Sequence, residues 1–168
     1  AKDAVVNGLT VGKGAGAVST NTAVGASALA GNSTGARITT VGYRAGVATT
    51  AGYNAFFGSY AGEANTSGTF NTALGDASLP GNTSGSYNVA VGQGSLNANT
   101  TASNNTAVGY QAAYSNTTGT VNSVFGYQAG YSNSTGGYNT FIGYAAGYTC
   151  TATGTANNTF IGQQSGYY

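Results

Sequence analysis

The chain has 168 residues and a formal net charge of +1, and charged residues make up only 4% of it, against about 25% in an ordinary soluble domain. Its four basic side chains all lie within the first 44 residues of the chain, which excludes the basic surface that nucleic-acid binding requires. No apolar run approaches the roughly 18–20 residues of a membrane helix, so membrane insertion is also excluded.

The first 20 residues are predicted to be a degenerate entry segment to a regular array. The stretch LTVGKG at 9–14 resembles one repeat unit, but its Gly12 precedes the next equivalent glycine by 13 residues. GKGAG at 12–16 has the glycines of a phosphate-binding loop without its spacing or its following Ser or Thr, so a plain Gly-rich bend is expected. The chain begins at Ala rather than Met, as expected of a mature product or a fragment.

Residues 21–168 are predicted to form one rod of about nine tandem repeats of about 17 residues. Each repeat has a glycine directly after an apolar residue, called the anchor glycine below, and successive anchors are 17, 16, 17, 17, 17, 17, 17 and 19 residues apart. A period held so tightly is typical of a solenoid or an array. The anchor glycines are Gly25, Gly42, Gly58, Gly75, Gly92, Gly109, Gly126, Gly143 and Gly162.

Within a repeat, a run such as NTAVG contains β-branched residues and ends at the anchor, which predicts a short strand followed by a bend. Tracts such as SNTTG and GNTSG have the chemistry of tight turns. Poor helix formers dominate, and no period near 3.6 appears. The predicted fold is therefore all-β: a repetitive β-solenoid, or a trimeric parallel β-roll or β-prism, with a 17-residue repeat. Coils stacked about 4.8 Å apart would make a rod about 40 Å long.

Stacking places equivalent residues in columns. The residue before each anchor is apolar and is predicted to form the core stripe of the rod. Four residues before the anchor, Asn recurs and is predicted to form a ladder of stacked amides, with Ile38 as the exception. Three before the anchor Thr predominates, and three after it the residue is always small. The predicted core column is Val24, Val41, Phe57, Leu74, Val91, Val108, Phe125, Ile142 and Ile161, and the predicted ladder is Asn21, Asn54, Asn71, Asn88, Asn105, Asn122, Asn139 and Asn158.

Aromatic residues also fall into columns, and two interpretations of them remain open. Tyr directly follows some anchors and lies five residues after others. Rows of rings that carry hydroxyl groups suit the recognition of sugars, whereas the simpler interpretation is packing of the rings between coils or between chains. The candidate residues are Tyr110, Tyr114, Tyr127, Tyr131, Tyr144 and Tyr148.

Candidate sites of chemistry or modification are few, and no enzyme activity, cofactor or metal is expected. Glu63 and Asp76 are expected to be solvated surface carboxylates, and the absence of His excludes His-based triads and metal sites. Cys150 is expected to be a small packed residue, with an intermolecular disulfide as the alternative. The Asn-x-Ser/Thr sequons are interpreted as by-products of turn composition unless the source glycosylates secreted proteins. They include Asn32, Asn65, Asn82, Asn116 and Asn133.

The motif NTAVGYQA at 105–112, which returns as NSVFGYQA at 122–129, resembles the Gly-rich repeats of bacteriophage tail fibres. More loosely, it is similar to the head repeats of trimeric autotransporter adhesins, which carry a SVAIG-like core. The opening at 5–29 resembles the entry to such a fibre region. The resemblance implies a homotrimer of parallel chains, an extracellular or virion location and a role in attachment. The repeat is longer than that of the adhesin heads, so an identical cross-section is not implied.

The leading hypothesis is a non-enzymatic structural fibre protein, an extracellular or virion rod for attachment to a host or a surface. Its expected partners are other copies of the chain, as a homotrimer or a polymer, and a host surface glycan or receptor. One alternative is a self-assembling extracellular filament subunit, because strand edges at the rod ends invite further subunits. Another is an ice-binding β-solenoid, because a regular Thr column can order water, although Ala55 and Val89 interrupt it.

Overall fold

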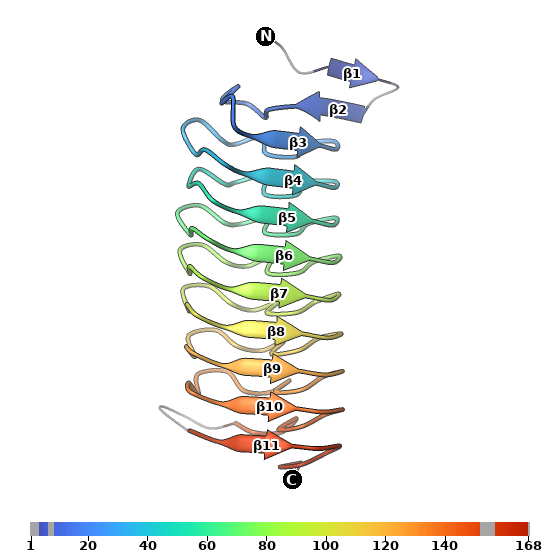
Figure 1. Cartoon of the computed structure of the whole chain (residues 1–168), viewed down its shortest axis with the longest axis vertical. Coiled ribbons are helices and arrows are strands. Elements are labelled where there is room, and N and C mark those ends of the chain that lie inside the picture. Colours follow the sequence, from blue (N-terminus) through green and yellow to red (C-terminus); the bar gives the residue numbers. More distant parts are fainter. Residues whose placement is uncertain (1–3, 7–8, 152–156, 168) are drawn as a thin grey trace.

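The computed structural model describes residues 4–6, 9–151 and 157–167, and this part of the chain is an all-β solenoid without helices (Figure 1). Eleven short strands form one sheet in which the spatial order follows the chain order. The predicted all-β solenoid with a repeat of about 17 residues is confirmed. The strands are β1 (Ala4–Val6), β2 (Leu9–Gly12), β3 (Thr22–Val24), β4 (Thr39–Val41), β5 (Ala55–Phe57), β6 (Thr72–Leu74), β7 (Val89–Val91), β8 (Thr106–Val108), β9 (Ser123–Phe125), β10 (Thr140–Ile142) and β11 (Thr159–Ile161).

Each coil closes within one chain. Strands β3 to β11 are parallel, and each pairs with the strand one repeat later, as in Thr106↔Ser123. Backbone hydrogen bonds between coils continue beyond the strands. For example, the N–H of Gly109 donates to the carbonyl of Val91 in the preceding coil at 2.7 Å. The hydrogen bonds that join successive coils are therefore made within one chain.

The entry segment contains a hairpin rather than a degenerate coil. β1 pairs antiparallel with β2, and β2 pairs antiparallel with β3, so that Gly12 at the end of β2 pairs with Ala23 of β3 rather than with another anchor glycine. The interpretation of LTVGKG as an early repeat unit is therefore wrong. A short connection suffices between antiparallel strands, whereas a parallel pair needs a whole coil between its strands. Residues 1–3 and 7–8 of the predicted entry segment, and 152–156 and 168 of the predicted rod, lie outside the described residues.

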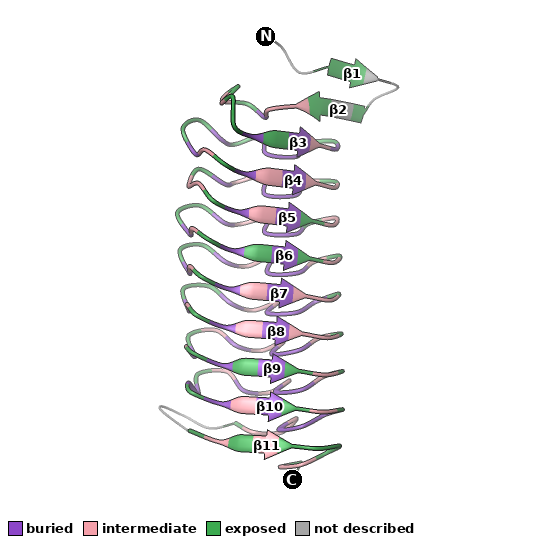
Figure 2. Ribbon diagram, viewed as in Figure 1, coloured by how far each residue is buried: buried purple, intermediate pink, exposed green. Residues whose placement is uncertain are grey.

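The predicted core column points outward. Side chains of a strand alternate between the two faces of the sheet, so only one of two neighbouring columns can be buried. In this column Leu74 is 51% exposed and Ile161 is 66% exposed, and none of the nine side chains is buried (Figure 2). The prediction of a core stripe is therefore wrong for all of its members, Val24, Val41, Phe57, Leu74, Val91, Val108, Phe125, Ile142 and Ile161.

The core consists instead of the residue two before each anchor, the small residue three after it and the residue four after it. A Cβ atom added to Gly62 would lie 2.6 Å from the ring of Phe56, whereas the next coil combines Ala73 with Leu79. A large or β-branched residue at the first position is always accompanied by Gly at the second, and Ala is accompanied by Leu except in the Ala107–Ala113 pair. In every coil but that of β8, the pairs therefore compensate in size. The pairs are Ala23–Leu29, Thr40–Gly46, Phe56–Gly62, Ala73–Leu79, Ala90–Leu96, Ala107–Ala113, Val124–Gly130, Phe141–Gly147 and Phe160–Gly166.

Candidate functional site

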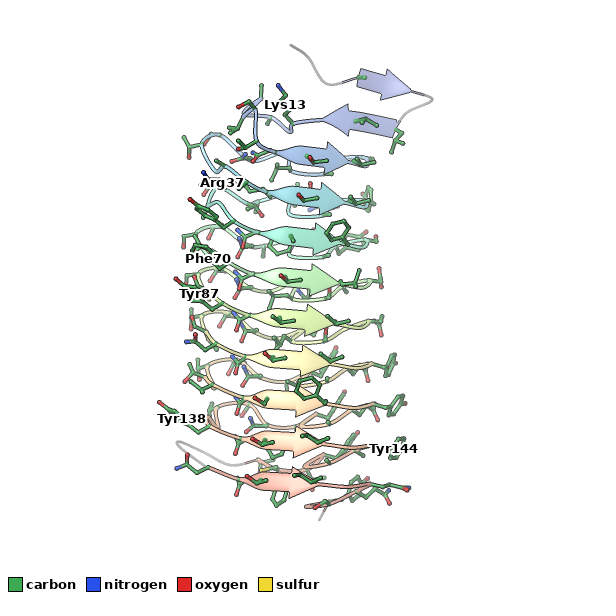
Figure 3. The ribbon with its side chains drawn as sticks, viewed as in Figure 1. Lys13, Arg37, Phe70, Tyr87, Tyr138 and Tyr144 are labelled. Atoms are coloured by element: carbon green, nitrogen blue, oxygen red, sulfur yellow. The ribbon has the colours of Figure 1, made fainter. Side chains whose placement is uncertain are left out.

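The outer face of strands β3 to β11, called the front face below, presents two columns of strand side chains (Figure 3). One is the apolar column before the anchors, and the other is the predicted Thr column two residues earlier. In both columns every side chain is exposed or only partly buried, and neither column contains a charged residue. Because the strands stack directly above one another (Figure 1), the two columns run side by side along the rod.

Aromatic rings line both edges of the front face. Phe70, Tyr87 and Tyr138, each five residues before an anchor, lie along one edge, and Tyr144, directly after an anchor, lies along the other (Figure 3). Most rings of the first edge belong to the coils of β5–β7, and most rings of the second edge to the coils of β8–β10. From the coil of β4 to that of β11, the first edge is Arg37, Tyr53, Phe70, Tyr87, Asn104, Val121, Tyr138 and Asn157, and the second edge is Tyr43, Ser59, Asp76, Gln93, Tyr110, Tyr127, Tyr144 and Gln163.

The rings of neighbouring coils stack face to face. On the second edge, the ring centroids of Tyr110 and Tyr127 are 5.0 Å apart and those of Tyr127 and Tyr144 are 5.3 Å apart. On the first edge, Phe70 lies between Tyr53 and Tyr87 at 4.7 and 5.1 Å. Rings in such a row cover one another's faces and leave their edges and hydroxyl groups to solvent. Since stacking on a sugar uses an open ring face, the structure favours the packing interpretation between coils.

A second tyrosine stack lies five residues after the anchors. Tyr114, Tyr131, Tyr148 and Tyr167 follow one another with ring centroids 5.1, 5.0 and 5.2 Å apart. All six candidate aromatic residues thus belong to one of two inter-coil stacks. Desolvation by the packed neighbours raises the pKa of the Tyr131 hydroxyl, with smaller contributions from the nearby Tyr148 and Tyr114 hydroxyls.

This raised pKa predicts that the rod loses stability in alkali. The pKa of Tyr131 in the folded chain lies above the value of about 10 in the unfolded chain, so the tyrosinate form favours unfolding. Below about pH 10, we expect the ionisation of Tyr131 to have no effect on the melting temperature. Above this pH, we expect it to lower the melting temperature. Thermal melts between neutral pH and strong alkali should show the fall, and Tyr131→Phe should reduce its slope. An identical slope in the variant would contradict the prediction.

The predicted Asn column forms a buried hydrogen-bonded ladder. The backbone N–H of Asn105 donates to Oδ1 of Asn88 at 3.0 Å, and Oδ1 of Asn105 accepts the backbone N–H of Asn122 at 2.9 Å. The side-chain amide of Asn105 also donates to the carbonyl of Gly119 at 2.9 Å. Because every coil must align for these bonds to form, the ladder fixes the register of the stack. Asn158 is partly buried and continues the ladder, while Asn21, Asn54, Asn71, Asn88, Asn105, Asn122 and Asn139 are buried.

A second Asn ladder, which the sequence interpretation missed, lies seven residues after the anchors. The side-chain amide of Asn99 donates to Oδ1 of Asn82 at 2.9 Å, and that of Asn116 donates to Oδ1 of Asn99 at 3.0 Å. The signal was present as a recurrence of Asn every 17 residues, but turn composition explained it equally well. Cys150 occupies the same column, partly buried against the core, as predicted for a small packed residue. The Asn members are Asn32, Asn65, Asn82, Asn99, Asn116 and Asn133, and all are buried.

The sequons noted in the sequence therefore belong to the second Asn ladder. They are Asn32, Asn65, Asn82, Asn116 and Asn133. Their amide groups are buried in the folded chain, and those of Asn65 and Asn82 donate to carbonyls of their own turns at 3.0 and 2.9 Å. A glycan would place a bulky polar group at a buried position. The sequons are thus explained by the ladder, whose Asn residues are followed by the Ser and Thr of the turn.

Within the described residues, charged side chains make an ion pair and a contact with an aromatic ring. Arg44 donates from Nε to Oε1 of Glu63 at 2.7 Å in a partly buried ion pair, and this pairing raises the pKa of Arg44. The guanidinium of Arg37 lies 5.1 Å from the centroid of the Tyr53 ring and continues the ring stack of the first edge. In the same part of the chain, no group of three His, Cys, Asp or Glu is placed to hold a metal ion. Nor does any helix there have the length and hydropathy to cross a bilayer.

Comparison of the chain with models of known protein families, with curated proteins and with solved structures finds no match. The fold and the arrangement of the ladders are therefore the basis of the functional inference below.

Proposed function

We propose that the chain is a non-enzymatic structural rod, which serves as a stiff spacer in an extracellular or virion attachment fibre. The observation that carries this proposal is the continuity of bonding along the rod axis. Backbone hydrogen bonds, two Asn ladders and stacks of aromatic rings all run from coil to coil. A solenoid stiffened at so many points of its cross-section resists bending, which is the property that a fibre shaft requires.

The composition of the surface agrees with this role. The front face carries Thr and apolar side chains in a regular array, and the last charged residue of the chain is Asp76. The resemblance of NTAVGYQA to tail-fibre repeats supports a fibre in an extracellular or virion setting. In such a fibre the partners would be other copies of the chain and a receptor on the attached surface.

The spacer role predicts that the length of the rod changes by one coil when one repeat is removed. Deleting residues 93–109 joins Gly92 to Tyr110 and takes out one 17-residue repeat. With spin labels on cysteines introduced at the exposed Thr34 and Thr118, five coils apart, the distance should fall by about 4.8 Å and its distribution should stay narrow. Pulsed electron paramagnetic resonance measures this in a Cys150→Ser background, with labelled chains diluted into unlabelled ones.

A matched control removes half a coil, residues 93–100, and should broaden the distance distribution because the columns no longer align. An unchanged distance after the whole-coil deletion, or a broad distribution in the parent chain, would show a flexible tether and refute the spacer role.

The two alternative functions retain the same fold. A filament subunit would sediment as open-ended polymers that grow with concentration. An ice-binding solenoid would use the Thr column, which lies on the front face, and would produce thermal hysteresis in solution. The absence of both behaviours would favour the spacer.

A further inference from the structure

We propose that the front face binds a second copy of this chain in an antiparallel pair, with a twofold axis that crosses the face between the coils of β7 and β8. The inference rests on the proposed structural role and names the partner of its main surface. In such a pair, the N-terminal ends of the two rods would point in opposite directions.

The exposed apolar column is the first evidence. Single exposed apolar residues are ordinary on protein surfaces, but a continuous apolar row suggests an interaction surface. Along the rod, the larger side chains Phe57 and Leu74 are followed by Val91 and Val108 and then by Phe125 and Ile142. These six side chains, which belong to the coils of β5–β10, are thus symmetric in size about a point between the coils of β7 and β8.

A twofold axis that lies in the plane of the face, perpendicular to the rod, makes every column face itself in the partner. The apolar column then lies on the apolar column, with Leu74 opposite Phe125 and Val91 opposite Val108. The Thr column lies likewise on the Thr column. In a parallel pair, a twofold axis along the rod would set the apolar column against the Thr column. Less apolar surface would then be buried on each side, so the pair would be less stable.

The edges of the face fit the same axis. On the second edge, each ring of the coils of β8–β10 would meet a polar residue of the partner. Tyr110 would lie opposite Gln93, Tyr127 opposite Asp76, and Tyr144 opposite Ser59. The Tyr127 hydroxyl could donate to the Asp76 carboxylate, which would otherwise be covered without a partner.

On the first edge, the rings in the middle of the rod would meet residues without a ring. Phe70 would lie opposite Val121, and Tyr87 opposite Asn104. A parallel pair would place Phe70 against Asp76, an apolar ring on a charge. Farther from the axis, Tyr53 would lie opposite Tyr138, so the antiparallel pair sets rings against residues without a ring only in the coils of β6–β9 of this edge.

The area and the pitch suit a second copy. The strands are three residues wide, so eight coils at about 4.8 Å and three residues at about 3.3 Å give a strand surface of about 38 by 10 Å. The side chains of both edges widen this contact toward the roughly 800 Å² per partner of a stable protein interface. A second copy has the same spacing between coils, so its side chains can pair with those of the first copy along the whole rod.

Sedimentation equilibrium of the purified chain tests the pair, and a dimer is expected. Leu74→Asp should sediment as a monomer with an unchanged circular dichroism spectrum, since the side chain points outward. Ser84→Asp, at an exposed position on a turn away from the front face, is the matched control and should remain a dimer.

A charge-pair experiment tests the register. Phe125→Lys alone should also be monomeric, but a mixture of the Leu74→Asp and Phe125→Lys chains should form a heterodimer, because residue 74 of one copy faces residue 125 of the other. A trimer, a polymer or a monomer for the unmodified chain, or the absence of heterodimers in the mixture, would overturn the proposal. A chain that is monomeric but keeps the distance change of the coil deletion would refute the pair and leave the spacer role intact.

Discussion

Replacing Gly109 with alanine is expected to lower the free energy of unfolding by about 3 kcal/mol or more. The anchor glycine has φ of 138°, a backbone conformation that an L-residue rarely adopts. A Cβ atom at this position would also collide with the carbonyl oxygen of Gly126, the anchor of the next coil. Because backbone faces backbone here, the two coils would have to separate and would weaken the hydrogen bonds between them. Denaturant titration followed by circular dichroism measures the loss.

Gly94→Ala is the matched control for this variant. Gly94 also has positive φ, but the nearest atom to an added Cβ is a side-chain carbon of Gln111 at 3.3 Å. The equivalent positions two residues after other anchors are occupied by Ala77 and Ala145, so the fold already tolerates alanine there. We expect a loss of less than about 1 kcal/mol. Equal losses in the two variants would show that coils do not approach one another as closely at the anchors as the structure describes.

Exchanging the sizes of Phe56 and Gly62 is expected to restore most of the stability that either single substitution removes. Phe56→Ala should cost about 3–5 kcal/mol because it empties the core of its coil. Gly62→Leu should cost about 3 kcal/mol because the new side chain would overlap the Phe56 ring. The double variant recreates the pair that Ala73 and Leu79 form in the next coil.

The backbone of Gly62 can accept a leucine, because its φ of 59° is close to the 51° of Leu79. Recovery should be incomplete, since the Phe56 ring also lies near Gly46 in the preceding coil, and we expect a net loss of about 1.5 kcal/mol. Denaturant titration of the four chains forms a double-mutant cycle.

A distant pair provides the control for that cycle. Gly62→Leu combined with Phe141→Ala, which lies five coils away, should show additive losses without rescue. Additive losses in the Phe56 and Gly62 cycle itself would refute size compensation as the principle of the core.

Much of the fold followed from the 17-residue period. A strict period with turn residues and β-branched residues permits a stack of short strands and little else, so the strand positions and the Asn ladder could be predicted. The second Asn ladder could have been predicted from the same recurrence. Its Asn residues lie beside Ser, Thr and Gly, however, and the local chemistry of a turn is the same whether its amide is exposed or buried.

The tertiary structure alone decided which side of each strand is the core. The residue before the anchor is more uniformly apolar than the one before it, which varies among Ala, Thr, Val and Phe, so the sequence pattern favoured the wrong column. A shift of one residue reverses the two faces of a strand. The correct choice depends on the return segment of the coil, where a residue six positions later compensates the size of the first. The period therefore determined that equivalent residues stack, and only the closure of the coil determined which of them are inside, because burial depends on what fills the space across the coil.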